Sequence, residues 1–330
     1  LNPTQQPVQE IKEKIRCQAQ DLGFDDCRFT TTDPPETGKY FLSWIGNSFH
    51  GEMDWIARER SVELRLNPGK ILPGAKTIIC LAKSYYEGEA QEGSAESCVA
   101  RYARIPDYHK TLKLPLERLT AFVNSLTTPA AKSHPLLDTG AILERDLSQR
   151  AGIGFIGKHN NLISKKLGNW FFLAEILTTL EVDADSPAIN LCGSCQKCLD
   201  ACPTGALTAP WILDSRKCLS YMTIENRKDI PKEYHSKMGA IFFGCDRCLE
   251  ACPWNKVVSA RSALPSHISG LPLSIKKLEQ MDDNTFKKHF SASPLLRAKR
   301  DGLLRNLIIA KNNGLSLPAE ENFLRIWKCQ

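Results

Sequence analysis

Eight of the 13 cysteines of this 330-residue chain crowd into one short segment. The first four follow the spacing C-x2-C-x2-C-x3-C-P, at Cys192, Cys195, Cys198 and Cys202. The last three follow C-x2-C-x3-C-P, with one cysteine upstream, at Cys218, Cys245, Cys248 and Cys252. Runs of this kind ligate iron–sulfur clusters through thiolates. The doubled pattern therefore predicts two [4Fe–4S] clusters in a ferredoxin-like module that transfers single electrons.

The spacing also predicts which cysteines share a cluster. Three thiolates two residues apart wrap one cubane, whereas the fourth, after a longer step, points to the other cluster. We assign the first cluster to Cys192, Cys195, Cys198 and Cys252. We assign the second to Cys202, Cys218, Cys245 and Cys248. Zinc sites and a disulfide framework are the alternatives; two CxxC units fit zinc, but the doubled pattern ending in Cys-Pro does not.

A glycine pattern, Gly152-x-Gly154-x-x-Gly157, could cradle a dinucleotide pyrophosphate. That fold needs a strand before the glycines and a helix after them, whereas here a helical pattern precedes them. A tight turn into a strand is the better interpretation.

The remaining pattern predicts an α+β protein of three parts. Apolar spacing indicates helices over 7–22, 115–126 and 141–151, and strands around 77–81 and 171–173. We expect an α/β domain over 1–186, a two-[4Fe–4S] ferredoxin-like domain over 187–258 and a short helical segment over 259–330. Helices are predicted there at 273–281, 284–290, 301–312 and 318–327.

Composition indicates where the chain works. No apolar run is long enough to span a bilayer, since Glu175 interrupts the run from Trp170 to Leu177, and no secretory signal is evident. Clustered cysteines in such a chain indicate metal ligands in the reducing cytoplasm. Residues 271–330 hold 11 Lys/Arg against 6 Asp/Glu, which suits a polyanion as well as an ordinary solvated helical surface.

Sequence blocks on both sides of the cysteines resemble the epoxyqueuosine reductases, which are cobalamin and iron–sulfur enzymes of tRNA modification. The matching blocks before the first run are His50-Gly-Glu-Met-Asp54, Leu72-Pro-Gly-Ala-Lys76, Arg101-Tyr-Ala103, Asp107-Tyr-His109, Asp138-Thr-Gly140, Glu144-Arg145, Ala151-Gly-Ile-Gly154 and Ile156-Gly-Lys158. Those after it are Pro203-Thr-Gly-Ala206, Leu213-Asp214, Cys218-Leu-Ser-Tyr-Met-Thr-Ile-Glu225, Gly244-Cys-Asp246 and Cys252-Pro-Trp-Asn255. The resemblance extends from the first helix to about residue 255, and more weakly beyond.

The resemblance implies reduction of epoxyqueuosine to queuosine at the wobble position of tRNA. Its cofactors would be two [4Fe–4S] clusters and a cobalamin that lacks its benzimidazole lower ligand. The partners would be the tRNA anticodon stem-loop and an electron donor, with no membrane, and we expect a cytoplasmic monomer. The C-terminal helices would be a tRNA-contacting repeat fragment.

The resemblance also implies roles for individual residues. Asp138 aligns with the proton donor, although by itself it would suit an N-cap or turn before the 141–151 helix. Arg145 would lie near the lower face of cobalt, with a surface charge as the alternative. Tyr108 and His109 would line the substrate pocket. Further cofactor contacts are expected from Arg58, Arg101, Lys158, Ser220, Tyr221 and Thr223.

Two other functions fit parts of the pattern. A reductive dehalogenase shares the plan of cobalamin plus ferredoxin, but is typically exported with a twin-arginine signal, which is not seen here. An electron-transfer subunit would need the clusters alone, and leaves the large preceding domain unexplained.

Overall fold

A computed structural model describes residues 5–86, 88, 98–257 and 275–315. The chain divides into two compact units, each built from separate stretches of sequence. The described parts of 1–84, 111–195 and 254–258 form the first unit, and those of 85–110, 196–253 and 259–330 form the second. The three-part division expected from the sequence stays a prediction.

The first unit is built on a sheet whose strand order is β1-β2-β6-β3, with every neighbouring pair antiparallel. Its central strands β2 and β6 are buried along nearly their whole length, because helices cover both faces. The strands are β1 (Asp26–Thr31), β2 (Thr77–Ser84), β3 (Ser133–Leu136) and β6 (Phe171–Thr178). The predicted α+β class is confirmed.

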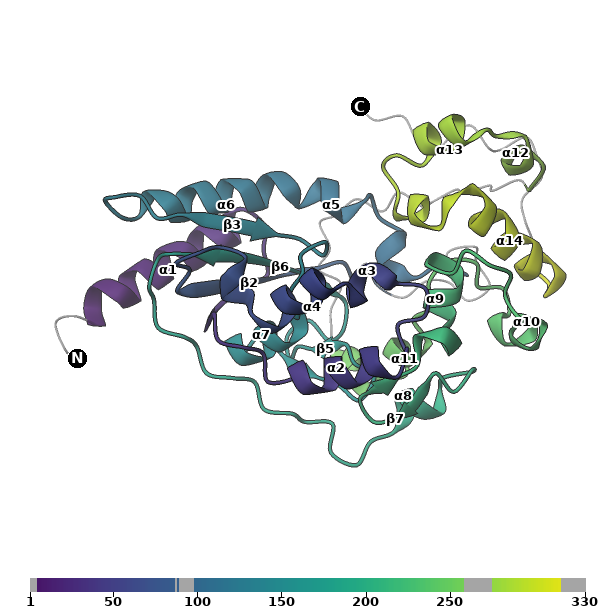
Figure 1. Ribbon diagram of the computed structural model, residues 1–330, viewed down its shortest axis with the longest axis horizontal. Coiled ribbons are helices and arrows are strands. Elements are labelled where there is room, and N and C mark those ends of the chain that lie inside the picture. The colour runs from purple at the N-terminus through teal and green to yellow at the C-terminus, as the bar shows by residue number, and fades with distance from the viewer. Residues whose placement is uncertain (1–4, 87, 89–97, 258–274, 316–330) are drawn as a thin grey trace. The chain divides into compact units, whose positions relative to one another are not determined.

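Helices α1 (Gln5–Asp21) and α6 (Lys113–Ser125) pack on one face of this sheet (Figure 1). Helix α7 (Glu144–Ala151) packs on the other face, against β1, β2 and β6. These three helices correspond to the predicted helices at 7–22, 115–126 and 141–151. The last begins three residues late, because residues 138–142 form turns and Leu143 is the N-cap.

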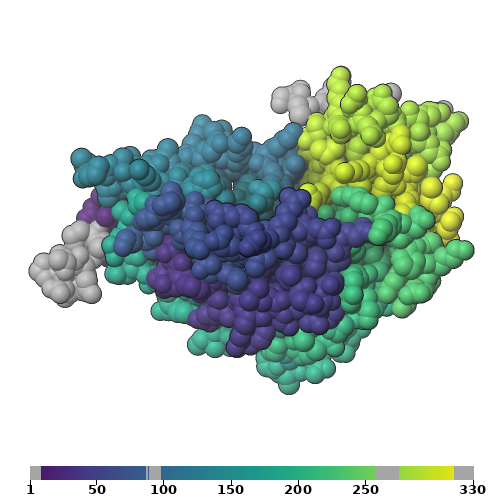
Figure 2. All heavy atoms as spheres, viewed as in Figure 1, coloured from purple at the N-terminus to yellow at the C-terminus, as the bar shows by residue number. Residues whose placement is uncertain are grey.

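Three short helices follow β1 in the chain. They lie on the surface of the first unit, on the side that faces the viewer in Figure 2. They are α2 (Gly38–Gly46), α3 (Asp54–Ala57) and α4 (Glu59–Leu66). Tyr40 and Trp55 on these helices are exposed, whereas Arg65 at the end of α4 is buried.

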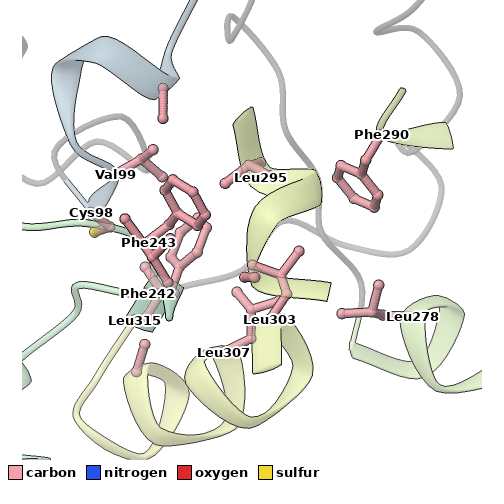
Figure 3. Packing of buried hydrophobic residues seen from close by; sticks show 14 of the residues in the cluster. Cys98, Val99, Phe242, Phe243, Leu278, Phe290, Leu295, Leu303, Leu307 and Leu315 are labelled. Atoms are coloured by element: carbon pink, nitrogen blue, oxygen red, sulfur yellow. The ribbon is translucent and has the colours of Figure 1, made fainter. Parts of the chain in front are cut away.

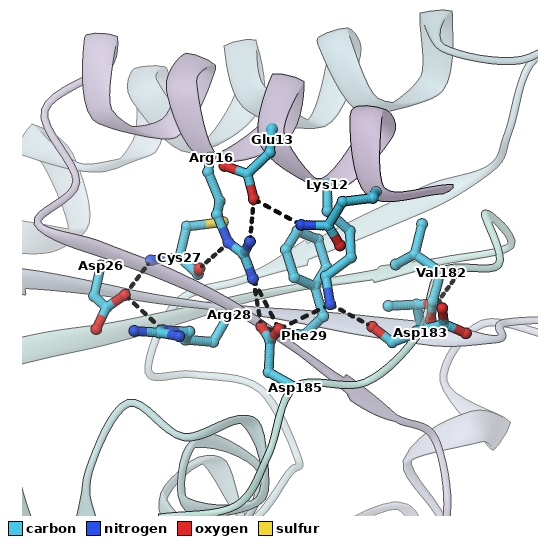
Figure 4. Close-up of polar contacts among 12 residues, drawn as sticks. Lys12, Glu13, Arg16, Asp26, Cys27, Arg28, Phe29, Val182, Asp183 and Asp185 are labelled. Atoms are coloured by element: carbon cyan, nitrogen blue, oxygen red, sulfur yellow. Dashed lines mark hydrogen bonds and ion pairs between the residues drawn. The ribbon is translucent and has the colours of Figure 1, made fainter. Parts of the chain in front are cut away.

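An ion-pair cluster fixes the segment that follows β6 to α1 and β1. The Asp185 carboxylate accepts hydrogen bonds from Lys12 Nζ at 2.8 Å and from Arg16 Nη2 at 2.8 Å (Figure 4). It also accepts from the Phe29 backbone N–H at 3.0 Å. Lys12 is buried, so Asp185 neutralises a charge that would otherwise be desolvated without a partner.

The glycine pattern forms a turn into a strand, as the sequence analysis favoured. Gly152 ends α7 with φ of +89°, a left-handed conformation that suits glycine. A hairpin of β4 (Phe155–Ile156) and β5 (Leu162–Ile163) follows. A Cβ atom on Gly154 would lie 2.4 Å from the Ile163 carbonyl oxygen, so the residue has to be glycine for the hairpin to close.

The second unit carries most of the cysteines and the C-terminal helices. Between Gln196 and Cys252 its α-helices and strands are α8 (Lys197–Asp200), β7 (Leu207–Ala209), β8 (Ile212–Leu213), α9 (Leu219–Ile224), α10 (Lys232–Met238) and α11 (Arg247–Glu250). The last elements are α12 (Ile275–Gln280), α13 (Asp283–His289) and α14 (Lys299–Asn312). They match three of the four predicted C-terminal helices, and the fourth, 318–327, lies outside the described residues.

An apolar core joins distant stretches of the second unit. Val99 and Phe243 form a parallel bridge, and both pack with residues of α14 such as Leu303 and Leu307 (Figure 3). Residues 98–103 therefore fold with the cysteine-bearing unit rather than with the sheet that precedes them in sequence.

Candidate iron–sulfur and acid sites

Four cysteine thiols of the second unit lie close enough to act on one another electrostatically. Burial raises the pKa of Cys248 well above its ordinary value, and negative charge on Cys218, Cys245 and Cys202 raises it further. Burial likewise raises the pKa of Cys245 to about 12, with Cys218 adding to the effect. Thiolates crowded in this way need a cation between them. These are the four cysteines that the spacing assigned to the second cluster.

Backbone N–H groups partly offset the cost of ionising Cys218. Burial raises the pKa of Cys218, while the backbone N–H groups of Tyr221 and Ser220 act in the opposite direction. Both residues lie in the first turn of α9, which starts directly after Cys218. Hydrogen bonds of this type to cluster sulfurs are one of the ways in which proteins set a cluster's potential.

Thr223 ties two of these ligand segments together. Its hydroxyl donates to the Leu219 carbonyl at 2.7 Å and accepts from the Gly244 N–H at 2.9 Å. The side chain is fully buried, so it holds the backbone before Cys245 against the helix after Cys218. The cofactor contacts expected of Ser220, Tyr221 and Thr223 stay predictions.

Cys192 and Cys195, two predicted ligands of the first cluster, lie in the first unit. Within the first unit, buried Lys158 donates through Nζ to the Gly193 carbonyl at 2.7 Å and to the Cys195 carbonyl at 2.9 Å. Lys158 was expected to contact the cofactor; the structure shows that it fixes the loop that carries two predicted cluster ligands.

No three His, Cys, Asp or Glu side chains in the described ranges are arranged around a single metal ion. A cubane makes a different demand, since each of its four irons takes one thiolate. No two of the described cysteines are joined by a disulfide.

A second candidate site lies on the loop between β3 and α7 in the first unit. Asp138 has φ of +57°, a left-handed conformation that aspartate, asparagine and glycine adopt in turns. It is exposed, and the N-cap of α7 is Leu143. Asp138 is thus a turn residue rather than a helix cap. Its role as proton donor, which the resemblance implies, stays a prediction.

Two further carboxyl groups are electrostatically linked to Asp138. Burial raises the pKa of Glu144 to about 7, and the Asp138 charge adds to the rise, while Arg145 and Arg65 oppose it. Burial also raises the pKa of Glu175 well above its ordinary value, and the charges of Glu144 and Asp138 raise it further. The protonation states of the three acids are therefore linked.

Arg145 is exposed at the start of α7 and donates to the Asn160 carbonyl at 2.9 Å. Next to Asn160, buried His159 accepts a hydrogen bond at Nδ1 from the Asn161 N–H. Burial, reinforced by the Arg145 charge, lowers the pKa of His159 to about 4. His159 is therefore neutral at physiological pH, and Arg145 is the cationic group of this corner.

The predicted substrate residues lie in the second unit. The rings of Tyr108 and His109 stack with their centroids 4.2 Å apart, and His109 Nδ1 lies 2.8 Å from Asp107 Oδ1. Burial disfavours the charged form of Asp107, but the His109 hydrogen bonds prevail and lower its pKa. The pair thus has a fixed orientation, and its role in substrate binding stays a prediction.

Two predicted cofactor-binding arginines differ in burial. Arg101 is buried in the second unit, where its backbone N–H donates to Asp246 at 2.6 Å and Nη1 donates to the Gly88 carbonyl at 2.6 Å. Arg58 is exposed between α3 and α4 of the first unit. Arg101 therefore has structural contacts of its own, whereas Arg58 is available to a ligand.

Sequence reasoning missed Glu175 and Glu144 as members of the acid group. Glu175 had a signal, because it is the only charge in an apolar run. That signal was used only against a membrane span, and the structure agrees on that point: no helix among the described residues is both long and apolar enough to cross one.

Comparison with known proteins identifies the family. The model described as "4Fe-4S double cluster binding domain" matches residues 191–255, so the predicted pair of clusters is confirmed. The model described as "Epoxyqueuosine reductase QueG, DUF1730" matches residues 65–139. The solved structure of an epoxyqueuosine reductase with an epoxyqueuosine-modified tRNA-Tyr stem loop has a TM-score of 0.82 at 28% identity, over 93% of this chain and 82% of that one.

Curated relatives agree over nearly the full length. The epoxyqueuosine reductase of Vibrio cholerae is 34% identical over 92% of this chain and 84% of its own. That of Cellulophaga algicola is 34% identical over 90% and 97%, and that of Escherichia coli is 33% identical over 96% and 84%. The chain therefore belongs to the epoxyqueuosine reductase family of oxidoreductases.

Proposed function

We propose that this chain reduces epoxyqueuosine to queuosine at the wobble position of tRNA. The observation that carries the proposal is the full-length similarity to epoxyqueuosine reductases, one of them solved with its modified stem loop. The double-cluster domain and the acid group beside Asp138 supply the two things that this reduction needs, electrons and protons.

The balance of the reaction defines what the chain has to deliver. Removal of the epoxide oxygen as water leaves an alkene and consumes two electrons and two protons. Each [4Fe–4S] cluster passes one electron at a time. Opening of the first C–O bond takes one proton onto the oxygen, and departure of that oxygen as water takes the second.

Cobalamin fits the polar groups that the first unit leaves without partners. Asn160 Nδ2 and His50 Nδ1 are buried and have no hydrogen-bond partner in the described structure. The amide side chains of a corrin ring both donate and accept hydrogen bonds, so they complement such groups. When bound, cobalamin would supply a cobalt ion that passes electrons to the epoxide carbon.

The protein's own residues then have separate tasks. Asp138 donates the proton to the epoxide oxygen, since it is exposed on its loop and its charge is linked to the protonation of two further acids. A Bacillus subtilis epoxyqueuosine reductase, with a TM-score of 0.82, has been solved with its catalytic aspartate loop swung out of the active site. Asp138 also lies on a loop, between β3 and α7. Arg145 would lie near the cobalt of a bound cobalamin, and Arg58, Arg101, Lys158, Ser220, Tyr221 and Thr223 are the further proposed cofactor contacts.

The tRNA anticodon stem-loop is the proposed partner, with Tyr108 and His109 at the modified base. Basic side chains on α12 and α13, including Lys287 and Lys288, would bind the tRNA phosphates. We also propose a monomer that works in the cytoplasm, where tRNA and a one-electron donor are both present.

The direct test is anaerobic turnover of epoxyqueuosine-containing tRNA with cobalamin and a strong reductant, read by nucleoside mass spectrometry. Conversion to queuosine is the expected result. Absence of conversion by protein that has bound both iron and corrinoid would contradict the proposal and favour reductive dehalogenation. Failure to bind corrinoid at all would favour a subunit that only relays electrons.

A further inference from the structure

Glu175 is a carboxyl group buried in an otherwise apolar face of the sheet. Its side chain is fully buried, and neither carboxylate oxygen has a hydrogen-bond partner within the described structure. Alternation along β6 places it on the same face as Phe171 and Leu177, which belong to the core beneath α7. A charged carboxylate in such surroundings is very costly, so the group holds its proton.

Strand register connects this acid to the loop of the proton donor. Glu175 on β6 is paired with Leu136 on β3, and Asp138 follows Leu136 by two residues. Helix α7, which begins with Glu144, packs on the same strand. The sheet and α7 therefore bring Glu175, Glu144 and Asp138 into one group.

The reaction needs more protons than one aspartate can carry. Two protons are consumed for each oxygen lost as water, and Asp138 holds one. Once the modified base covers the loop, the second proton has to come from within the protein. In the described structure the charges of Glu144 and Asp138 raise the pKa of Glu175, and the charge of Asp138 raises the pKa of Glu144.

We propose, on the basis of the proposed function, that Glu175 is a buried proton store that reprotonates Asp138 through Glu144 during each turnover. Asp138 gives the first proton to the oxygen as the C–O bond opens. Glu144 then transfers its proton to Asp138 and is itself reprotonated by Glu175. Asp138 gives the second proton to the departing hydroxyl, and the external reductant supplies both electrons. After product release, Asp138 and Glu175 each take up a proton from solvent, which replaces the two protons consumed.

The other ionisable groups around Glu175 are a neutral thiol and arginines, so the proposed relay consists of the three carboxyl groups alone. On β2, buried Cys80 is paired with Glu175 and is held as a neutral thiol, since burial and the Glu175 charge raise its pKa. On α7, Arg150 lies 3.5 Å from Asp146, which it neutralises. Arg145 and Arg65, from α7 and α4, act on Glu144 and oppose its protonation.

The test begins with protein that contains its clusters but no corrinoid, so that the acid is observed apart from turnover. Infrared spectroscopy in H2O and D2O detects the C=O stretch of a protonated carboxyl group. We expect such a band to persist at about pH 8, beyond the range of ordinary carboxyl groups. Glu175→Gln should remove it, and the matched surface variant Glu181→Gln should keep it, because Glu181 is exposed.

Single-turnover rates with corrinoid and modified tRNA then test the relay. Glu175→Gln should lower the rate at least tenfold, increase the solvent deuterium isotope effect and move the alkaline limb of the pH profile to lower pH. The limb moves down because Glu144, the acid that remains behind Asp138, loses its proton at lower pH than Glu175 does. Glu175→Asp, which keeps the acid, should restore part of the rate, and Glu181→Gln should match the unaltered protein.

Three results would overturn the relay. The first is an unchanged rate and pH profile in Glu175→Gln. The second is absence of the persistent band in the unaltered protein. The third is weaker corrinoid binding with an unchanged profile, which would make Glu175 a cofactor ligand. In each case the unaltered protein still converts epoxyqueuosine; if it does not, the proposed function fails and the relay with it.

Discussion

The ammonium group of Lys158 lies 2.9 Å from the carbonyl oxygen of Cys195, a predicted ligand of the first cluster. The same nitrogen lies 2.7 Å from the Gly193 carbonyl. One buried cation thus fixes the loop that presents Cys192 and Cys195, and places a positive charge beside it. Both effects bear on how firmly the first cluster is held.

Replacing Lys158 by methionine should weaken the first cluster and leave the second intact. Two hydrogen bonds to a charged donor are lost, each worth about 1.5–3 kcal/mol. We expect iron to leave in two phases under a chelator, with the fast phase accounting for one cluster. Lys165→Met, at an exposed position of the same unit, is the control. Release in one slow phase from both variants would contradict the role of Lys158.

Replacing Cys218 by alanine should remove the second cluster only. Cys218 is one of four thiols that act on one another in the second unit, so its loss leaves one iron of the cubane without a protein thiolate. Iron and sulfide analysis should give half the unaltered content, and the remaining cluster should still be reducible by EPR. Cys17→Ala, at an exposed cysteine of α1, should keep the full content. Full content in Cys218→Ala would refute the assignment.

Replacing Asp138 by asparagine should retain both clusters and corrinoid but abolish proton donation. General acids contribute about 10²–10⁴-fold, so we expect a loss of at least 100-fold in single-turnover rate. Thr139→Val, next to it on the exposed loop, tests whether the loop's conformation alone matters. Near-normal turnover by Asp138→Asn would remove Asp138 from the mechanism.

Replacing Asp185 by asparagine should destabilise the first unit by about 3 kcal/mol near pH 7, because it leaves buried Lys12 without its anion. Burial works against ionisation of Asp185, but hydrogen bonds from Lys12 and Arg16 prevail and lower its pKa. The stabilisation is thus present above the ordinary aspartate pKa and is lost as pH falls toward the folded-state value.

The measurement is urea unfolding of both proteins from about pH 7 to about pH 3, a range that spans the ordinary aspartate pKa. The difference between them should shrink as the pH falls. Asp183→Asn is the control, since the Asp183 side chain is exposed and only its carbonyl oxygen contacts Lys12. A difference that does not depend on pH would mean that packing, not charge, is responsible.

Replacing Gly154 by alanine should cost about 1–3 kcal/mol, since the new Cβ would lie 2.4 Å from the Ile163 carbonyl oxygen and force β4 away from β5. Gly46→Ala is the matched control, because a Cβ at that helical position meets nothing within 4 Å. Thermal unfolding should separate the two variants. Equal midpoints would show that the hairpin can relax without cost.

The cysteines illustrate what sequence can give. Ligand spacing is local, so Cys192 to Cys202 could be read as a cluster motif without knowledge of the fold. The helices α1, α6 and α7 and the strands β2 and β6 were also found, because their apolar periodicity is local. The start of α7 was misplaced, since the turns at 138–142 leave no signature in hydrophobic spacing.

The group of Asp138, Glu144 and Glu175 could not be predicted from the sequence. The link between Glu175 and Asp138 depends on β3 pairing with β6, and the sequence does not state that register. The exposure of Asp138 likewise becomes evident only in the folded loop. The hydrogen bonds of Lys158 to a loop 35 residues away could not be foreseen either, and its cofactor contact, implied by the resemblance, stays a prediction.

The bridge between Val99 and Phe243 has a consequence for how the protein is made. The Ala100 N–H donates to the Phe243 carbonyl at 2.8 Å, and Gly244 leaves no room for a Cβ, which would lie 2.4 Å from the Ala100 Cβ. On the ribosome, residues 98–103 emerge long before Phe243 exists. Residues 98–103 therefore cannot pack against Phe243 and Gly244 until synthesis has passed Cys245. Iron–sulfur assembly and completion of this core are therefore late, linked events in biosynthesis, and iron-starved cells should accumulate chains that proteases cut near residue 100.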